Sequence, residues 1–236
     1  MTLTSNLNRI LRRTVGLEIH KTRSSFDEAR LHIIDEKKVT LLLDGGANEG
    51  QWASRVRRDG YSGRTLSVEP GARAFSKLQF NSRNDPLWTV SKHALGSKQE
   101  TLILHLASND GMSSSLKKPE RHLKEFPSVT FSGTEEVPVT TIENLLQDYD
   151  DNVMLKLDVQ GFELEALEGI GEELRKIVAV ELELTLQPLY CNEASVGLIL
   201  FTLNNLGFEL FSISEFGKLK NGQVTYFDVI ATRKRF

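Results

Sequence analysis

A glycine-rich loop that directly follows an apolar run constrains this chain more than any other feature. Residues 39–43 predict a buried strand that ends at Asp44, three glycines lie within the next six positions, and residues 51–58 predict a helix. Glycines at such a turn let backbone amides approach a bulky ligand closely. The strand, the turn and the helix therefore predict a nucleotide-type pocket in an α/β protein.

Short apolar runs continue to alternate with helical patterns along the chain. This alternation predicts a mostly parallel sheet with helices on both faces. The last two strands, around the turn pair Asn221-Gly222, predict a closing antiparallel hairpin. The further predicted strands span residues 64–68, 87–91, 137–140, 153–157, 177–182, 208–213 and 224–231, and the further predicted helices span 72–82, 142–147, 162–174 and 195–206.

The length of 236 residues suits one domain, predicted over residues 35–236 after an extension over residues 1–34. An insertion at about 98–136 interrupts the alternation. It opens with an antiparallel strand at 100–106 and continues in a polar stretch at 109–127, which is too long for an ordinary connection. We expect this stretch to be a functional loop or lid, with a plain surface insertion as the alternative.

Charge and cysteine content narrow the partners and the location. A net charge of −3 makes nucleic acid a poor partner. Residues 1–23 are basic with apolar residues at helical spacing, which predicts an amphipathic helix that contacts an anionic membrane surface, a partner or its own domain. The lone Cys191 has no internal disulfide partner. No apolar run is long enough to span a bilayer, so we expect a cytoplasmic protein, which is membrane-peripheral if residues 1–23 bind a membrane surface. The sequence leaves the oligomeric state open.

The glycine loop carries the first chemical indication. Its spacing is not the Gly-x-Gly-x-x-Gly of dinucleotide-binding proteins, and it lacks the lysine of a phosphate-binding loop. The carboxylate of Asp44 suits the ammonium of an amino-acid moiety better than a pyrophosphate. S-adenosylmethionine carries such an ammonium. The candidates for cofactor contact here are Asp44, Gly45, Gly46, Ala47, Asn48, Gly50 and Gln51.

Two further segments complete the predicted cofactor site. Glu69 ends the second strand, where an acid accepts both ribose hydroxyls of a bound nucleoside, and Pro70 turns the chain away. After the third strand, Ala94 and Leu95 are candidates to leave room for an adenine ring, with a plain turn as the alternative.

A second distinctive loop, at residues 156–163, places ionisable groups at the carboxyl end of a buried strand. We interpret Asp158 as a general base or metal ligand that also borders the cofactor, with Lys156 offsetting its charge and Glu163 or Glu181 orienting them. The alternative is that Lys156 forms a structural ion pair with Glu163 or Glu181.

Other catalytic groups remain open at this point. His93, His105 and His122 lie in or near the insertion and are alternative bases. The sequence has no zinc pattern, and Mg²⁺ held by Asp158 with Glu181 is left undecided.

Six motifs in order resemble the FkbM family of S-adenosylmethionine-dependent methyltransferases, over roughly residues 35–232. Two departures stand out: Gly45 replaces the usual valine, and Ile142-Glu143 replaces leucine-aspartate. The matching motifs are Leu-Asp-Gly-Gly-Ala-Asn-Glu-Gly-Gln at 43–51, Ser-Val-Glu-Pro at 67–70, Ala-Leu-Gly at 94–96, Ser-Ser-Ser-Leu at 113–116, Val-Thr-Thr-Ile at 139–142 and Leu-Lys-Leu-Asp-Val-Gln-Gly-Phe-Glu at 155–163.

The resemblance implies a Rossmann-like class I methyltransferase fold with a mostly parallel seven-stranded sheet, and transfer of a methyl group to a hydroxyl of a sugar, glycolipid or other natural-product acceptor. It implies that Asp44, Gly46, Asn48, Gly50 and Glu69 bind the cofactor. It also implies that Lys156, Asp158 and Glu163 shape the reaction centre. The rival interpretations are a cofactor-binding protein without methyl transfer and an NAD-dependent oxidoreductase. Methylation of base nitrogens is disfavoured because residues 158–161 contain no proline.

Overall fold

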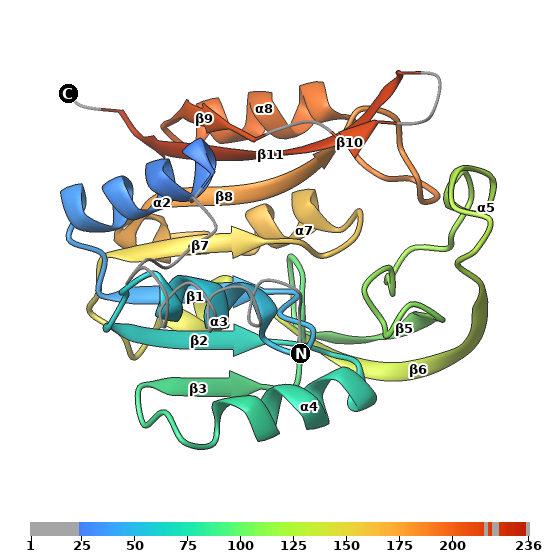
Figure 1. The fold of residues 1–236 in the computed structure, drawn as a ribbon, viewed down its shortest axis with the longest axis horizontal. Helices are drawn as coiled ribbons and strands as arrows, with labels where there is room; N and C mark the ends of the chain where they lie inside the picture. Colours follow the sequence, from blue (N-terminus) through green and yellow to red (C-terminus); the bar gives the residue numbers. More distant parts are fainter. Residues whose placement is uncertain (1–23, 215–216, 219–221, 235–236) are drawn as a thin grey trace, which may run out of the picture.

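The computed structural model describes residues 24–214, 217–218 and 222–234 of the chain. Its elements alternate between strands and helices in the first part of the chain, and strands dominate the insertion and the carboxyl-terminal part (Figure 1). The strands are β1 Leu41–Gly45, β2 Arg64–Val68, β3 Trp88–Ser91, β4 Ala94–Leu95, β5 Glu100–Ala107, β6 Phe131–Thr140, β7 Val153–Leu157, β8 Ile177–Thr185, β9 Phe208–Ile213, β10 Gly217–Lys218 and β11 Val224–Arg233. The helices are α2 Ser25–Glu36, α3 Gln51–Arg58, α4 Ala72–Ser82, α5 His122–Glu125, α6 Ile142–Leu146, α7 Glu163–Glu168, the 3₁₀ helix η1 Gly171–Lys176, and α8 Val196–Asn205.

The main sheet has the order β3-β2-β1-β7-β8-β11, with β9 and β10 on the outer edge of β11. The strands β3, β2, β1, β7 and β8 are parallel, and β11 runs antiparallel between β8 and β9. The predicted fold, a mostly parallel sheet closed by antiparallel strands, is therefore confirmed. In the register of β1, Asp44 lies between Ser67 of β2 and Lys156 of β7.

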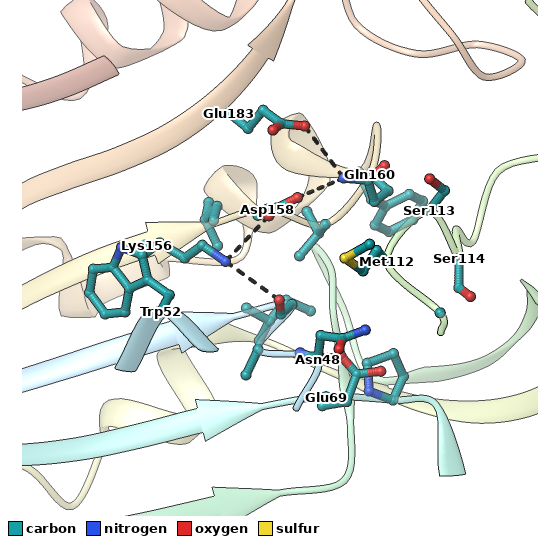
Figure 2. Close-up of a pocket in the computed structure, with 18 of the residues that line it drawn as sticks. Asn48, Trp52, Glu69, Met112, Ser113, Ser114, Lys156, Asp158, Gln160 and Glu183 are labelled. Atoms are coloured by element: carbon teal, nitrogen blue, oxygen red, sulfur yellow. Dashed lines mark hydrogen bonds and ion pairs between the residues drawn. The ribbon is translucent and has the colours of Figure 1, made fainter. Parts of the chain in front are cut away.

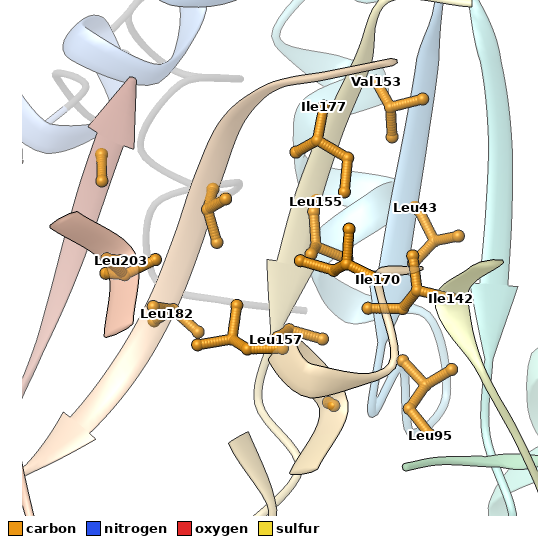
Figure 3. Packing of buried hydrophobic residues seen from close by; sticks show 14 of the residues in the cluster. Leu43, Leu95, Ile142, Val153, Leu155, Leu157, Ile170, Ile177, Leu182 and Leu203 are labelled. Atoms are coloured by element: carbon orange, nitrogen blue, oxygen red, sulfur yellow. The ribbon is translucent and has the colours of Figure 1, made fainter. Parts of the chain in front are cut away.

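Alternate residues of the central strands face two separate cores. Leu43, Leu155 and Leu157 pack toward α6, α7, η1 and α8 (Figure 3). Leu42 and Met154 point the other way, toward α2 and α3. Because both faces are covered by helices, the strands read as nearly continuous apolar runs, which is why they were predictable.

The insertion forms a second sheet of order β4-β6-β5, which lies beyond the arrowheads of β1 and β2 (Figure 1). The predicted antiparallel strand at 100–106 is confirmed, because β5 pairs antiparallel with β6. Strand β6 begins at Phe131 instead of the predicted Val137. Most side chains of its first half are exposed or half-exposed, so no apolar run marks that half.

Helix α2 begins within the stretch 1–34 that was assigned to the amino-terminal extension, ends at Glu36, and packs on the sheet. Ser24 caps it by accepting a hydrogen bond from the Asp27 N–H at 3.1 Å. Phe26 and Ile33 are buried in the core that α2 shares with α3. The amphipathic helix predicted over residues 1–23 lies outside the described residues. Within the described ranges, no helix has the length and apolar character to cross a membrane.

Candidate active site

A cavity of about 580 Å³ opens at the carboxyl ends of β1, β2, β7 and β8 (Figure 2). The predicted lid supplies one wall, since Asn109, Gly111 to Ser114, Leu116, His122 and Phe126 all line it. In Figure 2, Asn48 and Glu69 lie on one side of Asp158, and Glu183 lies on the other. Of the predicted site residues, the cavity is lined by Gly46, Ala47, Asn48, Gln51, Glu69, Pro70, Ala94, Leu95, Lys156, Asp158 and Glu181.

The two predicted loops touch backbone to backbone. Gly46 adopts a φ of +72°, and a Cβ there would lie 1.9 Å from the carbonyl oxygen of Asp158. The Asp158 N–H donates to the Gly45 carbonyl at 3.1 Å. The space that a side chain at Gly45 would enter is already filled, with Leu95 Cδ1 2.5 Å from the Cβ position. Leu95 thus accounts for glycine where the family usually has valine.

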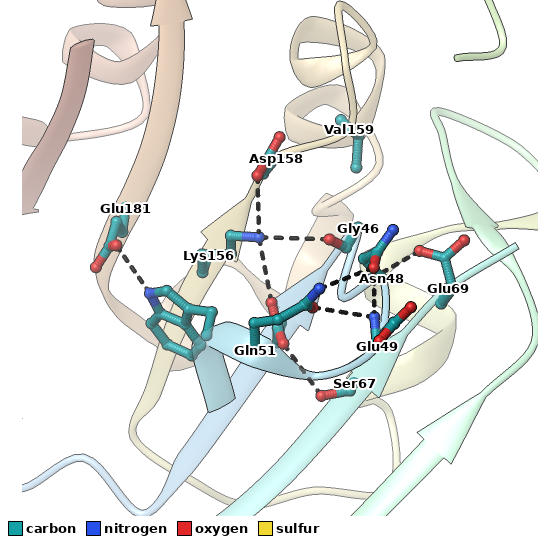
Figure 4. Close-up of polar contacts among 12 residues, drawn as sticks. Gly46, Asn48, Glu49, Gln51, Ser67, Glu69, Lys156, Asp158, Val159 and Glu181 are labelled. Atoms are coloured by element: carbon teal, nitrogen blue, oxygen red, sulfur yellow. Dashed lines mark hydrogen bonds and ion pairs between the residues drawn. The ribbon is translucent and has the colours of Figure 1, made fainter. Parts of the chain in front are cut away.

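Glu69 lines the cavity and accepts two backbone hydrogen bonds. Its Oε2 accepts from the Asn48 N–H at 2.9 Å and its Oε1 from the Gly71 N–H at 2.8 Å (Figure 4). Each carboxylate oxygen has a second acceptor position, so the group retains capacity for two hydroxyls. Burial raises the pKa of Glu69 to about 7, against the opposing effect of these backbone hydrogen bonds.

Lys156 lies between two carboxylates. Its Nζ is 3.4 Å from Oδ1 of Asp44 and 3.6 Å from Oδ2 of Asp158. Burial lowers the pKa of Lys156, and the carboxylates of Asp158, Asp44 and Glu181 raise it by more, so the lysine stays charged. The alternative that Lys156 forms an ion pair with Glu163 or Glu181 is wrong; its ion-pair partners are Asp44 and Asp158.

Asp44 occupies a different environment from the one expected. Its side chain is fully buried and does not line the cavity. Ser67 Oγ donates to its Oδ2 at 3.2 Å, and Lys156 faces its Oδ1. The ammonium that Asp44 faces is therefore that of Lys156, because β7 lies beside β1 in this register. A direct contact between Asp44 and a cofactor ammonium is not supported by this arrangement.

Glu181 is also placed differently from the prediction. Arg30 of α2 donates to both of its carboxylate oxygens, at 2.6 and 2.8 Å, and Trp52 Nε1 donates to Oε1 at 2.9 Å. Glu181 borders the cavity, but these contacts bind it to α2 and α3 rather than to Asp158. The predicted orienting role of Glu181 does not fit this geometry, nor does a Mg²⁺ ion held jointly by Glu181 and Asp158, which the sequence left undecided. Across the described ranges, no group of three His, Cys, Asp or Glu side chains has the geometry of a metal site.

Glu163 shapes the second loop from beneath. Its Oε1 accepts from the Val159 N–H at 3.0 Å and from the Gly161 N–H at 3.2 Å. The side chain is buried and is not part of the cavity wall, so Glu163 contacts the loop backbone and not the cavity.

The pH dependence of stability tests this burial. Burial raises the pKa of Glu163 from 4.5 to about 7. The folded state therefore binds the Glu163 proton more tightly than the unfolded state does, and this tighter binding stabilises the protein. The stabilisation is full below pH 4.5 and is lost as the pH rises through about 7. Glu163→Gln keeps an acceptor oxygen and stays neutral. We expect its melting temperature, relative to wild type, to rise between pH 5 and pH 8, as measured by calorimetry. A constant difference across that range would contradict the burial effect.

Gln160 connects the second loop to the lid, and the sequence analysis did not single it out. Its Nε2 donates to Asp158 Oδ1 at 2.7 Å, and its Oε1 accepts from the Tyr190 hydroxyl at 2.9 Å. Ser115 Oγ donates to its carbonyl at 2.6 Å. The position of Gln160 within the motif at 155–163 was the signal available in the sequence, whereas Tyr190 and Ser115 are brought to it by tertiary structure.

The three histidines divide by location. His93 and His122 line the cavity, and His105 does not. His93 Nδ1 lies 2.8 Å from Ser91 Oγ at the end of β3. His122 is packed among Phe126, Phe131 and Tyr190, and burial lowers its pKa, so it is neutral near pH 7.

Comparisons with known proteins agree with these features. The Methyltransferase FkbM domain family matches residues 44–210. The chain is 26% identical over 201 residues to the 2-O-methyltransferase NoeI of Sinorhizobium fredii, which covers 80% of this chain and 79% of that protein.

Two solved structures have similar folds. The methyltransferase FkbM of Methylobacillus flagellatus superposes with a TM-score of 0.49 at 14% identity; the match covers 81% of this chain and only 43% of that chain. The magnesium protoporphyrin IX methyltransferase of Synechocystis, with bound S-adenosylmethionine, gives a TM-score of 0.47 at 9% identity over 99% of both chains.

Proposed function

Because this chain belongs to the FkbM family of methyltransferases, we propose that it transfers the methyl group of S-adenosylmethionine to a hydroxyl oxygen of a sugar, glycolipid or related natural product. The observation that carries the proposal is the placement of Glu69 and the glycine loop on one side of Asp158, with further carboxylates on the other. A single cavity thus holds a nucleoside-type site beside an acid-lined site.

The residues present fit the cofactor. A Cβ at Gly46 would enter the Asp158 backbone, so a glycine keeps the two loops in contact beneath the cavity. Glu69 retains two acceptor positions for a ribose diol, and the apolar side chains of Ala94, Leu95 and Phe162 line the same cavity and suit an adenine ring. When bound, the sulfonium would supply an electrophilic methyl group.

The acid-lined side fits a polyhydroxylated acceptor. Asp158, Glu183 and Asp228 line the cavity as hydrogen-bond acceptors, and Trp52 and Tyr226 line the same cavity as aromatic side chains. Carboxylates accept hydrogen bonds from hydroxyl groups, and the aromatic rings offer apolar contact area. The name of the relative from Sinorhizobium fredii supports oxygen as the methylated atom. Lys156 holds Asp158 beside this space by their ion pair.

Glu69→Gln tests the cofactor site. Glutamine keeps one oxygen for a backbone N–H but loses the second acceptor group and the charge. We expect S-adenosylmethionine and S-adenosylhomocysteine to bind wild type and to bind the variant about 10- to 100-fold more weakly, because hydrogen bonds to a charged group contribute about 1.5–3 kcal/mol. Isothermal titration calorimetry measures both affinities. Glu168→Gln, an exposed site on α7, is the matched control.

NAD serves as the third titrant. Binding of NAD by wild type, or of none of the three ligands, would overturn the proposed function. Transfer of labelled methyl from S-adenosylmethionine to a panel of glycosides then distinguishes an enzyme from a protein that only binds the cofactor.

A further inference from the structure

Glu183 lies on the acid-lined side of the cavity, at a position that no pattern in the sequence indicated. It lies on β8 two residues after Glu181 and lines the cavity. In the antiparallel register of β8 and β11, Asp228 is its direct partner. Figure 2 shows Glu183 on the side of Asp158 and Gln160 that faces away from Glu69.

Glu183 and Asp158 differ in how strongly their carboxylates are engaged. Asp158 is 3.6 Å from the Lys156 ammonium and accepts from Gln160 Nε2 at 2.7 Å. Glu183 accepts from the same Gln160 Nε2 at 3.5 Å. A cation and a short hydrogen bond thus hold the Asp158 carboxylate in place, whereas the hydrogen bond that Glu183 accepts is long.

Burial and most of the charges that face Glu183 disfavour its ionised form. Burial raises its pKa, and the carboxylates of Asp158 on the second loop, Asp228 on β11 and Glu163 on α7 raise it further, whereas Lys156 on β7 lowers it. A carboxylate whose pKa is raised is a stronger proton acceptor than an ordinary carboxylate, as a general base requires.

We propose that Glu183 takes up the proton of the hydroxyl group that is methylated, and that Asp158 orients that hydroxyl toward the methyl group. The inference rests on the proposed function. In the step, the hydroxyl oxygen forms a bond to the methyl carbon, the carbon–sulfur bond breaks with its electron pair left on sulfur, and the hydroxyl proton passes to a carboxylate oxygen of Glu183. Glu183 then releases the proton to water.

Glu183→Gln is the central variant, because the amide keeps the shape and polarity but cannot take up the proton. With labelled S-adenosylmethionine and a panel of p-nitrophenyl glycosides, we expect kcat to fall at least 100-fold, with KM for the glycoside within about threefold, in the range typical of loss of a general base. The wild-type rate should rise with pH until Glu183 is ionised.

Asp228→Asn removes a like charge beside Glu183 and should shift that rise to lower pH by about half a unit or more. Glu209→Gln, exposed on β9, is the matched control.

Two measurements distinguish failure of this inference from failure of the proposed function. Calorimetry with S-adenosylmethionine should give wild-type affinity for Glu183→Gln; a wild-type protein that does not bind it would overturn the proposed function instead. If none of the glycosides is methylated, the titration of Glu183 is measured instead, by ¹³C NMR of the protein with labelled glutamate. The Glu183 signal is identified because it is lost in Glu183→Gln. We expect it to titrate well above 4.5 and to move down in Asp228→Asn. Three results would each overturn the inference. The first is an unchanged kcat in Glu183→Gln, and the second is a rise of rate with pH that is lost in Asp158→Asn but kept in Glu183→Gln. The third is titration of Glu183 near 4.5, the ordinary value for a glutamate.

Discussion

Lys156→Met is expected to lower the free energy of unfolding by about 3–5 kcal/mol, the range for removal of one partner from a buried ion pair. The substitution leaves Asp44, which is fully buried, with Ser67 as its remaining hydrogen-bond donor. It also removes the cation that holds Asp158 beside the cavity. Urea unfolding followed by circular dichroism measures the loss, and methyl transfer should fall with it.

Two companion variants test the cause. Asp44→Asn combined with Lys156→Met removes the unpaired charge, so it should recover part of the lost stability even though it carries one more substitution. Lys98→Met removes an exposed ion pair with Glu100, 3.3 Å long, and should change stability by less than about 1 kcal/mol. A Lys156→Met variant as stable as Lys98→Met would show that the buried pair contributes little.

The strands of the main sheet were predictable from sequence because helices bury them on both faces. Leu41 to Leu43 and Val153 to Leu157 have almost no exposed surface, so their sequences are nearly continuous apolar runs. The glycine loop and Glu69 were predictable for a related reason. Parallel strands bring their carboxyl ends to one edge, and residues that end such strands meet there whatever lies between them in sequence.

The partners of the charged groups were not predictable. Arg30 and Glu181 are 151 positions apart, and only the packing of α2 against β8 brings them together. The same applies to the pair of Lys156 with Asp44, which the register of β7 against β1 adds to the pair with the nearby Asp158. A pattern of charges along a chain gives candidates for ion pairs, whereas the choice among them depends on tertiary contacts.

Glu183 was missed because the predicted strand ended too early. The apolar pattern predicted a strand over 177–182, but β8 continues to Thr185. Beyond Leu182 the strand is held by pairing with β11, since Glu183 lies opposite Asp228 and Thr185 opposite Tyr226. Two acids facing each other in a ladder are unfavourable for folding alone. A strand that retains such a pair at a cavity is consistent with a role in function.

Gly46→Ala is expected to disrupt the site at its base. The φ of +72° costs an alanine about 1–2 kcal/mol. Its Cβ would also lie 1.9 Å from the Asp158 carbonyl oxygen, so the two loops must separate, at about 1–3 kcal/mol for overpacking. Since Gly46, Asn48 and Asp158 all border the cavity, this separation should weaken S-adenosylmethionine binding at least tenfold and stop methyl transfer, as measured by calorimetry and label transfer.

Gly207→Ala separates backbone strain from the clash. Gly207 follows α8 with a φ of +86°, and the nearest atom to its Cβ position is 3.8 Å away. Its replacement should cost only the strain, about 1–2 kcal/mol, and leave cofactor affinity unchanged. The difference between the two variants therefore measures the contact between the two loops. Equal losses of stability, with cofactor affinity retained in Gly46→Ala, would mean that the loops tolerate separation and that their contact does not build the cofactor site.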